Sequence, residues 1–513
     1  MFLFSKNHHG IRNYLLILAL LVSVFSFSAS FTTAAATTTH AQTTYTYYLP
    51  FLANSYVMSG TTGSYTTYLA IQNTGSATAN INIQYYQANN GSSNGGTGIL
   101  VSPPPATCTT IAAHAECTAP NPFSHGVKGT GIISSDQPLK VIVPEATPYG
   151  GTAYTATDQQ GQWFLPFVSN DAFGGFTSQF VLFNSGSDPI QVYISIIAQN
   201  GYLYQPDRIY IPGYSSYTFD LANTAALNLP TGSYGWASIS AKDAFGGALL
   251  PNLVVQLLQR NTDTHFLTLT NAKLITIPFT PQNNSTIYIP TVFNQAFGSY
   301  KTGLSIMNET NSPITVTVTY YDNIGTVINT APFVFPSSSK IVTIYHGDTS
   351  GDGLPIGGLP VGFYGSATIT TQGGSIDVLV NQIGGLTAGG MGQTGTYIAP
   401  SKGSSSVYLP VMDNGGFGFT TGATILNTSN QPVTATVQYY NLDGSPVGHL
   451  QTYNIAGNAS QAVYQGDPSQ GLAVGFKGTA LVTETSGAAN SLIVTTNAQS
   501  NDFFYTYTSA QQE

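Results

Sequence analysis

Charged residues are scarce in this 513-residue sequence: Asp, Glu, Lys and Arg make up 6% of it, against about 25% in an average soluble protein. With 12 Lys and Arg against 21 Asp and Glu, the chain lacks the positive charge needed to neutralise a phosphate backbone. We therefore expect no nucleic-acid partner. A content of 42% hydrophobic and 12% aromatic residues argues against disorder. The composition predicts a folded chain whose surface consists of hydroxyl and amide side chains.

Cysteine is also scarce. The sequence has two cysteines, Cys108 and Cys117, which lie nine residues apart. In an oxidising compartment such a pair predicts a local disulfide, and the spacing differs from the CxxC of redox and metal sites. We expect the disulfide to clip a hairpin around the turn at residues 112–115.

A long apolar run occurs once, near the N-terminus. Residues 14–31 follow a segment that carries Lys6 and Arg12 and no acid, and small residues then lead to Ala41. This order is typical of a signal peptide cleaved after Ala41, and an uncleaved membrane anchor is the alternative. We predict a signal peptide over residues 1–41 and a secreted, cell-surface-associated chain that does not insert in a membrane after cleavage.

Four copies of one unit follow the apolar run. Each copy opens with an apolar phrase that contains a proline and, four residues later, an asparagine; a second asparagine then precedes an alternating segment. These repeat anchors are Pro50, Asn54, Asn73, Pro166, Asn170, Asn184, Pro290, Asn294, Asn308, Pro410, Asn414 and Asn427. Recurrence in four copies favours a requirement of the fold over one active site. We interpret the prolines as residues that limit further pairing at the start of edge strands, and the asparagines as residues that fix turns by hydrogen bonds to the backbone.

Alternation of apolar and polar residues predicts strands with one buried face. In the first copy Ile81, Ile83 and Tyr85 alternate with polar residues, and the other copies keep the same offsets. Each copy also has a Gly-x-x-Gly step before a strand, which is Gly126 and Gly129 in the first copy. We expect these glycines to supply an unusual backbone angle or a close strand approach, because no phosphate-loop residues follow. About seven or eight short strands per copy are typical of an antiparallel sandwich.

The Tyr-Leu-Pro openings, the Asn-Thr/Ser-Gly-Ser turns at residues 73–76 and 184–187 and the Tyr-Tyr strand ends carry a resemblance to a known class. The chain resembles secreted bacterial proteins built from tandem immunoglobulin-like β-sandwich repeats, over almost all of its mature length. The resemblance implies a structural or adhesive role at the cell surface. We predict an all-β fold of four tandem antiparallel β-sandwich (Ig-like) domains on a string, over residues 42–160, 161–282, 283–403 and 404–513.

No recurring set of residues points to catalysis. None of the histidines after residue 41 occupies the same place in two copies, which excludes a shared triad. His346 and Asp348 come nearest to a catalytic pair. Asp348, Ser350 and Asp352 resemble the first half of a calcium loop, but Leu359 stands where its bidentate Glu belongs. We expect no enzyme activity, no catalytic residue and no cofactor, with calcium at this half-loop as the open alternative.

Phe-Gly loops are the candidate binding or contact features. They occur in copies two to four, at Phe173, Phe297 and Phe417. An aromatic ring on such a loop stacks on a sugar or packs on the next domain, and the sequence leaves both readings open. Glycosylation acceptor patterns occur at Asn90, Asn284 and Asn458.

The sequence thus favours a non-enzymatic extracellular structural protein, such as a sheath, fibre, surface-layer or adhesive component. Its low charge removes the repulsion that opposes close packing, so we expect self-association or association with other cell-surface proteins. An array of carbohydrate-binding modules that holds polysaccharide is the first alternative. A secreted hydrolase is the second.

Overall fold

The computed structural model describes residues 43–57, 64–87, 97–102, 108–147, 150–173, 175–222, 227–261, 267–271, 273–275, 284–297, 300–310, 312–335, 341–346, 359–386, 392–416, 418–500 and 504–509. The chain divides into two units, Met1–Gln42 and Thr43–Glu513. The predicted signal peptide lies outside the described residues. We call the four sequence copies in the second unit repeats 1 to 4.

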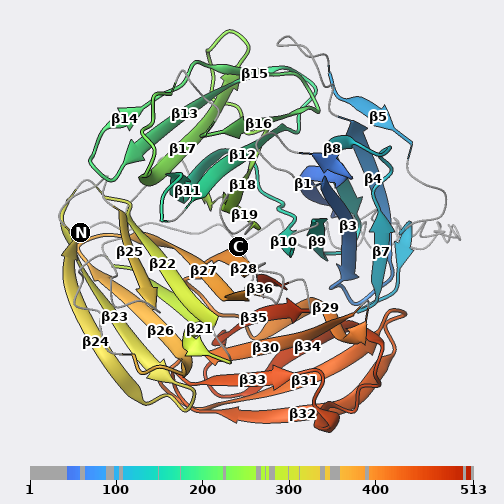
Figure 1. Ribbon diagram of the computed structural model, residues 1–513. Helices are drawn as coiled ribbons and strands as arrows, with labels where there is room; N and C mark the ends of the chain where they lie inside the picture. Colours follow the sequence, from blue (N-terminus) through green and yellow to red (C-terminus); the bar gives the residue numbers. More distant parts are fainter. Residues whose placement is uncertain are drawn as a thin grey trace, which may run out of the picture. The chain divides into compact units, whose positions relative to one another are not determined.

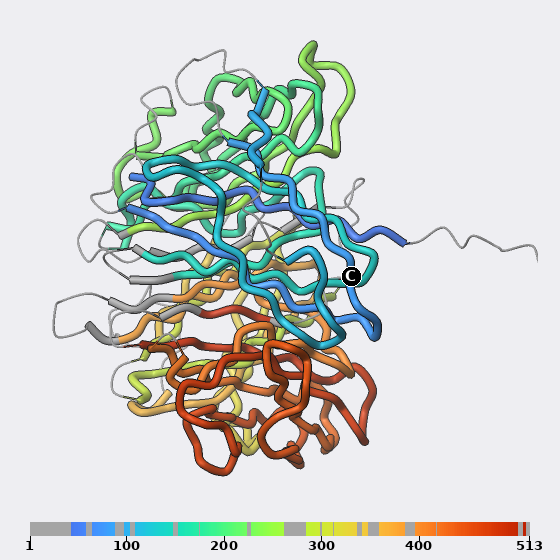
Figure 2. Tube along the Cα trace, turned by 90° about the vertical axis from the view of Figure 1, so that its right-hand side faces the viewer, coloured from blue at the N-terminus to red at the C-terminus, as the bar shows by residue number. Residues whose placement is uncertain are grey.

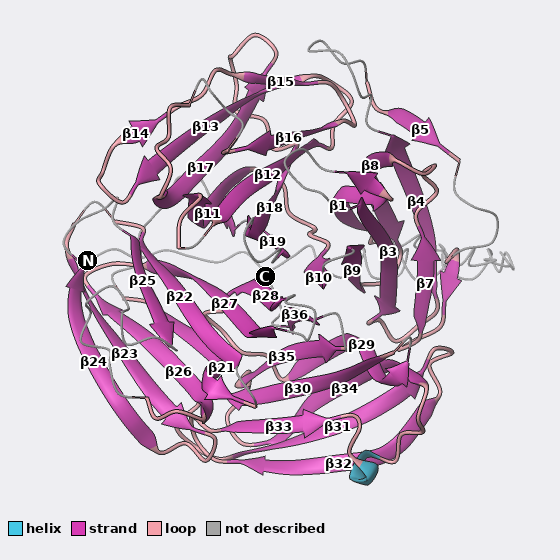
Figure 3. Cartoon of the chain, viewed as in Figure 1, coloured by secondary structure: helices cyan, strands magenta, loops and turns pink. Residues whose placement is uncertain are grey.

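Strands make up most of the described chain (Figure 3). Strand β31 (Val433–Asn441) illustrates the cause, because its β-branched and aromatic residues alternate between buried and half-buried positions along the strand. Val437 and Tyr439 face the core, as the alternation predicts. One 3-10 turn, η1 (Pro468–Gln470), interrupts the strands where the Asp467 side chain accepts a hydrogen bond from the backbone N–H of Ser469.

Repeat 1 consists of β1 (Tyr45–Asn54), β2 (Tyr56–Val57), β3 (Ser64–Asn73), β4 (Ala79–Gln87), β5 (Ile99–Val101), β6 (Thr110–Ile111), β7 (Glu116–Pro120), β8 (Val127–Ser135), β9 (Leu139–Thr147) and β10 (Gly150–Thr155). Its first sheet has the order β1-β8-β4-β5, with β6 also on β4. Its second sheet has the order β10-β9-β3-β2, with β7 also on β3. All of these pairs are antiparallel.

Repeat 2 consists of β11 (Gln162–Asn170), β12 (Phe176–Asn184), β13 (Ile190–Ala198), β14 (Leu203–Tyr204), β15 (Ile209–Ile211), β16 (Ser216–Asp220), β17 (Ser233–Asp243), β18 (Leu253–Asn261), β19 (Leu267–Asn271) and β20 (Lys273–Ile275). The first sheet has the order β14-β13-β17-β11-β20, with β15 also on β13. The second sheet has the order β16-β12-β18-β19.

Repeat 3 consists of β21 (Thr286–Ala296), β22 (Tyr300–Asn308), β23 (Ile314–Asp322), β24 (Val327–Phe335), β25 (Ile341–His346), β26 (Phe363–Gln372), β27 (Ile376–Leu386) and β28 (Gly392–Ile398). Repeat 4 adds β29 (Ser406–Gly416), β30 (Phe419–Asn427), β32 (Pro446–Ile455), β33 (Ser460–Tyr464), β34 (Phe476–Ser486), β35 (Leu492–Gln499) and β36 (Phe504–Ser509) to β31. The strand order is β24-β23-β26-β21-β22-β27-β28 in repeat 3, with β25 also on β22, and β32-β31-β34-β29-β30-β35-β36 in repeat 4, with β33 also on β30. A short pairing, β21 with β22 or β29 with β30, joins the half that corresponds to the first sheet to the half that corresponds to the second.

Two sheets in each repeat enclose a hydrophobic core. In repeat 1, Leu49 and Ile83 of the first sheet and Ile71 and Val141 of the second belong to one buried cluster. Similar clusters fill the other repeats. The structure is therefore all-β and sandwich-like, with antiparallel sheets, in agreement with the coarse fold prediction.

The predicted hairpin around the turn at residues 112–115 is wrong, because β6 pairs with β4 in the first sheet and β7 with β3 in the second. The equivalent turns of other repeats show the same arrangement. Strands β15 and β16 flank the turn at residues 212–215, yet β15 pairs with β13 in the first sheet and β16 with β12 in the second. The same separation occurs between β24 and β25 in repeat 3. Each turn therefore carries the chain from one sheet to the other as an arch. Alternation specifies which residues are buried, but not which sheet each strand joins.

Four strands, one from each repeat, meet at the centre of the unit Thr43–Glu513 (Figure 1). β10 contacts β19, β19 contacts β28, β28 contacts β36, and β36 returns to contact β10. In the view turned by 90°, most strands of the four repeats run across the picture (Figure 2). The repeats thus contact one another in a closed cycle, whereas the sequence suggested separate domains on a string. The exact domain boundaries remain predictions.

Candidate interaction surface

The first asparagine of each repeat holds the turn that precedes the Gly-x-x-Gly strand. Asn54 Nδ2 donates to the Phe123 carbonyl at 2.6 Å, and the Asn54 carbonyl accepts from the Gly126 N–H at 2.7 Å. Asn170, Asn294 and Asn414 make the same pair of bonds with Leu229 and Gly232, Leu359 and Gly362, and Leu472 and Gly475. These asparagines therefore serve the backbone of their own repeat.

The second asparagine clamps the arch to the strand that ends beside it. Asn73 Nδ2 lies 2.7–3.1 Å from the carbonyls of Ala77, Ile111 and Ala112, and its Oδ1 accepts from the Gly75 N–H. Asn184 and Asn427 repeat this arrangement, and Asn308 repeats its local part. Asn73, Asn184, Asn308 and Asn427 are all nearly or fully buried.

The recurring prolines lie inside strands at a β-bulge, and the prediction that they open a strand is wrong. In β1 the register with β8 shifts between Leu49 and Leu52, around Pro50. Proline fits there because the extra residue of a bulge is not paired in the strand ladder, so no backbone N–H is needed at that position. Equivalent shifts surround Pro166, Pro290 and Pro410.

A hydroxyl side chain also recurs beside this bulge, and it is not among the predicted repeat anchors. The Thr67 Oγ1 of β3 accepts from the Ala53 N–H of β1 at 3.0 Å and so ties the two sheets together. Ser178, Thr302 and Thr421 bond in the same way to the N–H groups of Ser169, Phe293 and Asp413. All four hydroxyl residues stand six positions before the second asparagine, so the repeat alignment contains the signal.

Both glycine predictions hold, one for each glycine of the step. Gly126, Gly232, Gly362 and Gly475 have φ of 80, 83, 85 and 89°, in the left-handed region. The second glycine permits a close approach: a Cβ on Gly478 would lie 2.0 Å from the Tyr440 carbonyl oxygen of the neighbouring strand. A Cβ on Gly235 or Gly365 would meet a backbone oxygen at 2.1 or 2.0 Å.

The predicted disulfide between Cys108 and Cys117 is present, with the two Cα atoms 5.7 Å apart. Cys117 lies in β7 of the second sheet, whereas Cys108 lies just before β6, which pairs with β4 of the first. The bond therefore links the two sides of the arch at residues 112–115, where a hairpin was predicted.

The Phe-Gly loops pack against aromatic side chains of their own repeats. Phe173 lies 4.8 Å from Tyr234 between ring centroids, and Phe297 lies 5.3 Å from Tyr364. Both phenylalanines keep a positive φ, and Phe297 remains 70% exposed. Phe417 lies outside the described residues. These loops thus leave part of an aromatic surface open to solvent.

His346 is a buried structural residue. Its Nδ1 bonds to the Thr302 carbonyl and its Nε2 to the Tyr320 hydroxyl, each at 2.7 Å. Burial lowers its pKa to about 4, so the ring is neutral near pH 7. In repeat 4 the equivalent bond joins Gln465 to the Tyr439 hydroxyl. A glutamine at the same place indicates a hydrogen-bonding role in the fold.

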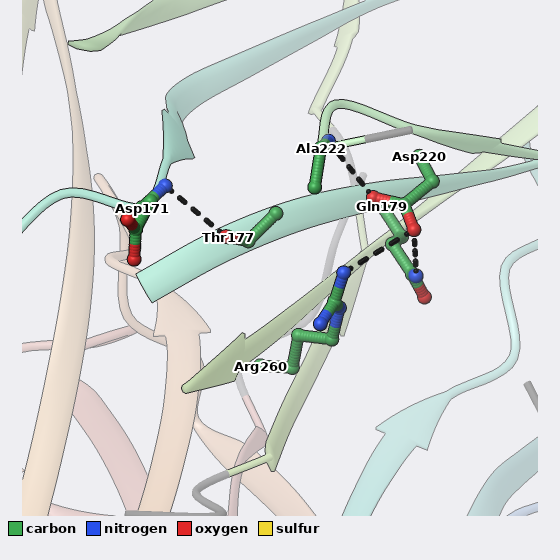
Figure 4. Close-up of polar contacts among 6 residues, drawn as sticks. All are labelled: Asp171, Thr177, Gln179, Asp220, Ala222 and Arg260. Atoms are coloured by element: carbon green, nitrogen blue, oxygen red, sulfur yellow. Dashed lines mark hydrogen bonds and ion pairs between the residues drawn. The ribbon is translucent and has the colours of Figure 1, made fainter. Parts of the chain in front are cut away.

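A buried ion pair lies in the second sheet of repeat 2 (Figure 4). Arg260 of β18 approaches Asp220 of β16 at 3.3 Å, and Gln179 of the intervening β12 donates to the same carboxylate oxygen at 2.8 Å. The adjoining face contacts repeat 1, where Lys128 Nζ donates to Thr218 Oγ1 at 2.9 Å. Burial lowers the pKa of Lys128 to about 8. Buried Lys128 thus makes a hydrogen bond across the junction of repeats 1 and 2.

The remaining candidates for chemistry are a metal site and the calcium half-loop. No group of three or more His, Cys, Asp or Glu side chains that could hold a metal occurs among the described residues. The half-loop Asp348, Ser350 and Asp352 lies outside them, as does Asn90. In the same described part, no helix is long and apolar enough to cross a membrane.

The arches form the surfaces through which successive repeats meet. At the third residue of the arch, the tip residue, the backbone has φ of 63° in His114, 52° in Tyr214 and 59° in Asn458. This conformation projects the tip from its own repeat toward the first sheet of the repeat before it, which we call the platform. Recurrence in the sequence does not reveal the tips, because their residue type differs from copy to copy.

The described tips contact their platforms through stacked rings or through the backbone carbonyl of the tip residue. Tyr214 stacks on Tyr86 of repeat 1, with ring centroids 4.6 Å apart. The Asn458 carbonyl accepts from Ser366 Oγ of repeat 3 at 3.2 Å. The tip of repeat 3 falls in residues 336–340, outside the described residues, although Ile341 beside it belongs to the buried cluster of repeat 2.

The platform of repeat 4 receives the tip of repeat 1 and so closes the cycle. The His114 ring stacks on Tyr440 and Tyr408, with centroids 5.1 and 6.3 Å away. Its carbonyl accepts from Thr479 Oγ1 at 3.0 Å. The Glu116 N–H donates to the Leu442 carbonyl at 3.1 Å. We call this junction the seam.

Comparisons with known proteins show no family for this chain. No family model and no curated protein matches the chain. Among solved structures, Escherichia coli alpha-2-macroglobulin activated by porcine elastase aligns at 9% identity and a TM-score of 0.10. The alignment covers 90% of this chain and 44% of that one. A TM-score this low carries no argument about fold or function.

Proposed function

We propose that this chain is a secreted, non-enzymatic structural protein, made of four immunoglobulin-like sandwich repeats after a signal peptide. Its role is to associate with further copies or with other proteins at the cell surface. The observation that carries the proposal is the use of its recurring polar side chains. Asn54, Asn73, Thr67 and their equivalents all bond to backbone groups that hold strands, bulges and arches.

Two further observations support this proposal. The disulfide between Cys108 and Cys117 suits an oxidising compartment outside the cytosol. The net charge of −9 is spread thinly over 513 residues, so neighbouring molecules repel one another weakly. The tips and platforms through which the repeats meet are complementary surfaces, and association between molecules needs surfaces of this kind.

Negative-stain electron microscopy of purified residues 42–513, beside intact cells, tests the proposal. We expect ordered filaments, sheets or a surface layer that the purified protein reproduces. Isolated single molecules at every concentration, with no matching structure on cells, would contradict a structural role.

Carbohydrate binding is a second candidate, favoured by the exposed rings on the Phe-Gly loops. Phe297 is 70% exposed and rests on Phe293 and Tyr364, which gives it a firm aromatic base. Retention on insoluble polysaccharide, competed by soluble sugar and lost in Phe297→Ala, would support this function. Unchanged retention in the variant would count against these loops.

A further inference from the structure

The seam is the junction whose two sides come from repeats that are not consecutive in the chain. Thr479 and His114, which bond across it, lie 365 residues apart in the sequence. The other junctions join repeats 1 and 2, 2 and 3, and 3 and 4, which are adjacent along the chain. The seam is therefore held by non-covalent contacts with no short linker beside it.

One row of side chains at the seam is more polar than the equivalent rows of the other repeats, although it lies beside an apolar row that contains Ala70 and Ile142. Gln72 stands one residue before the second asparagine of repeat 1, where the other repeats have Phe183, Met307 and Leu426. In the neighbouring strands Glu116 and Lys140 pair with Gln72. Ser216, Ile341 and Ser460 occupy the position of Glu116, and Val254, Asp377 and Ile493 that of Lys140. Repeat 1 therefore presents an amide and two ionisable groups where the other repeats present mainly apolar side chains.

The platform side of the seam shows the same difference. Asp413 of β29 pairs with Lys477 at the position that Ala53, Ser169 and Phe293 occupy in the other repeats. Asp413 is 6% exposed. Its charge acts on Glu116 of repeat 1, so two carboxyl groups face each other across the seam. The hydroxyls of Tyr68 and Tyr507 lie in the field of both acids.

Burial of several of these polar and ionisable side chains is energetically unfavourable. Gln72 is fully buried, and neither polar atom of its amide has a hydrogen-bond partner among the described residues. Burial raises the pKa of Asp413 to about 7, against the opposing effect of Lys477. Burial and then the Asp413 charge raise the pKa of Glu116 well above its usual value. Unpaired buried polar groups cost an interface stability, and at the seam they lie beside an apolar cluster of Ala70, Ile142, Val411 and Tyr507 that bridges repeats 1 and 4.

The tip and the platform are different surfaces, so the seam is a heterologous contact. Such a contact forms a closed ring within one molecule, or an open chain when successive molecules supply the two sides. We propose that the seam opens and that the tip of repeat 1 then binds the repeat 4 platform of a second copy of this chain. This inference rests on the proposed function and names the surface by which copies associate. The partner is a second copy of this chain, because its repeat 4 platform is the same surface that the tip of repeat 1 contacts within one molecule.

Two variants each disable one side of the seam. Gly444 has φ of +84°, and a Cβ on it would lie 2.4 Å from the Ala113 carbonyl oxygen, so Gly444→Ala blocks the platform. His114→Gly removes the ring that stacks on Tyr408 and Tyr440 and tolerates the φ of 63°. Each variant retains the side that the other lacks.

Mass photometry and size-exclusion chromatography with light scattering test the inference on residues 42–513. We expect the wild type to form head-to-tail oligomers as its concentration rises, because closure within one molecule dominates when it is dilute. Each variant alone should remain monomeric, whereas an equimolar mixture should form one-to-one dimers. Circular dichroism confirms that each variant is folded.

Gly325→Ala is the matched control. Gly325 is the equivalent of Gly444 in repeat 3, with φ of +89° and 2.4 Å from its would-be Cβ to the Gly457 carbonyl oxygen. This control has an intact seam and should assemble like the wild type. Oligomers of both single variants that equal those of the wild type would overturn the inference and leave self-association to another surface. A wild type that stays monomeric throughout would overturn the proposed self-association as well.

Discussion

At the scale of single residues, one buried asparagine joins three segments of backbone. Asn427 Nδ2 reaches the carbonyls of Gln431, Ile455 and Ala456, and its Oδ1 accepts from the Ser429 N–H. The asparagine thereby fixes the turn that follows it and the arch on the opposite strand. The sequence analysis identifies this position by its recurrence, and the contacts explain why the residue recurs.

Replacing Asn427 by alanine should lower the free energy of unfolding by about 2 kcal/mol, because buried carbonyls lose their donor. Urea unfolding monitored by circular dichroism measures the change. Asn454→Ala in the same repeat is the control, since Asn454 is exposed, and it should change stability by less than about 0.5 kcal/mol. Equal effects of the two substitutions would contradict the clamp.

His346 should make stability fall in acid. Its pKa is lowered to about 4 in the folded chain from an ordinary 6.5, so the unfolded chain binds the proton first as pH falls. The contribution is fully present above pH 6.5 and declines as pH drops toward 4. His346→Gln copies the bond of Gln465 to Tyr439 and should remove this part of the pH dependence. Urea midpoints of both proteins between pH 4 and 7 give the comparison, and parallel curves would refute it.

At the scale of elements, the sequence predicts strands better than it predicts sheets. Alternating burial in β13 and β31 follows the apolar pattern, and the turns fall where glycine, proline and asparagine gather. The partner of a strand depends on contacts beyond its own residues, so β15 and β16 cannot be assigned to opposite sheets from their sequences. Tips such as Tyr214 escape detection for a related reason, because their partners belong to another repeat.

The two glycines of one step should respond differently to alanine. Gly478→Ala places a Cβ against the Tyr440 carbonyl and must push β31 and β34 apart, so a loss of about 3 kcal/mol is expected. A Cβ on Gly475 would have no atom within 4 Å, so Gly475→Ala only strains the backbone at φ of +89°, which costs about 1 kcal/mol. Thermal and urea unfolding rank the two variants. A larger loss for Gly475→Ala would show that backbone conformation outweighs strand approach.

At the scale of the whole molecule, the four repeats form a cycle whose junctions are not alike. Buried apolar side chains such as Phe183 and Leu426 face the preceding repeat at two junctions, whereas Gln72, with Glu116 and Lys140 beside it, occupies the seam. The seam therefore differs from these two junctions in its side-chain chemistry. Sequence alone shows the repetition, but the ring closure depends on contacts between distant repeats.

The seam should weaken as pH rises. Asp413 has a folded pKa of about 7 against an ordinary 3.8, so its burial is least costly below pH 4 and the cost grows until pH 7. Glu116 acts in the same direction. Asp413→Asn should flatten the decline between pH 4 and 7 and strengthen the seam contact at pH 8, both within one molecule and between copies. Urea midpoints and mass photometry across this range measure both effects, and an unchanged pH slope would exclude Asp413 as the cause.

The central meeting of β10, β19, β28 and β36 also sets an order of events during synthesis. β10 emerges from the ribosome long before β36, its neighbour in the finished centre. Early repeats can build their own sandwiches from nearby strands, but the centre waits for β36. Until then β10 lacks one of its lateral partners. A nascent chain is therefore open-ended, and closure is among the last steps of its folding.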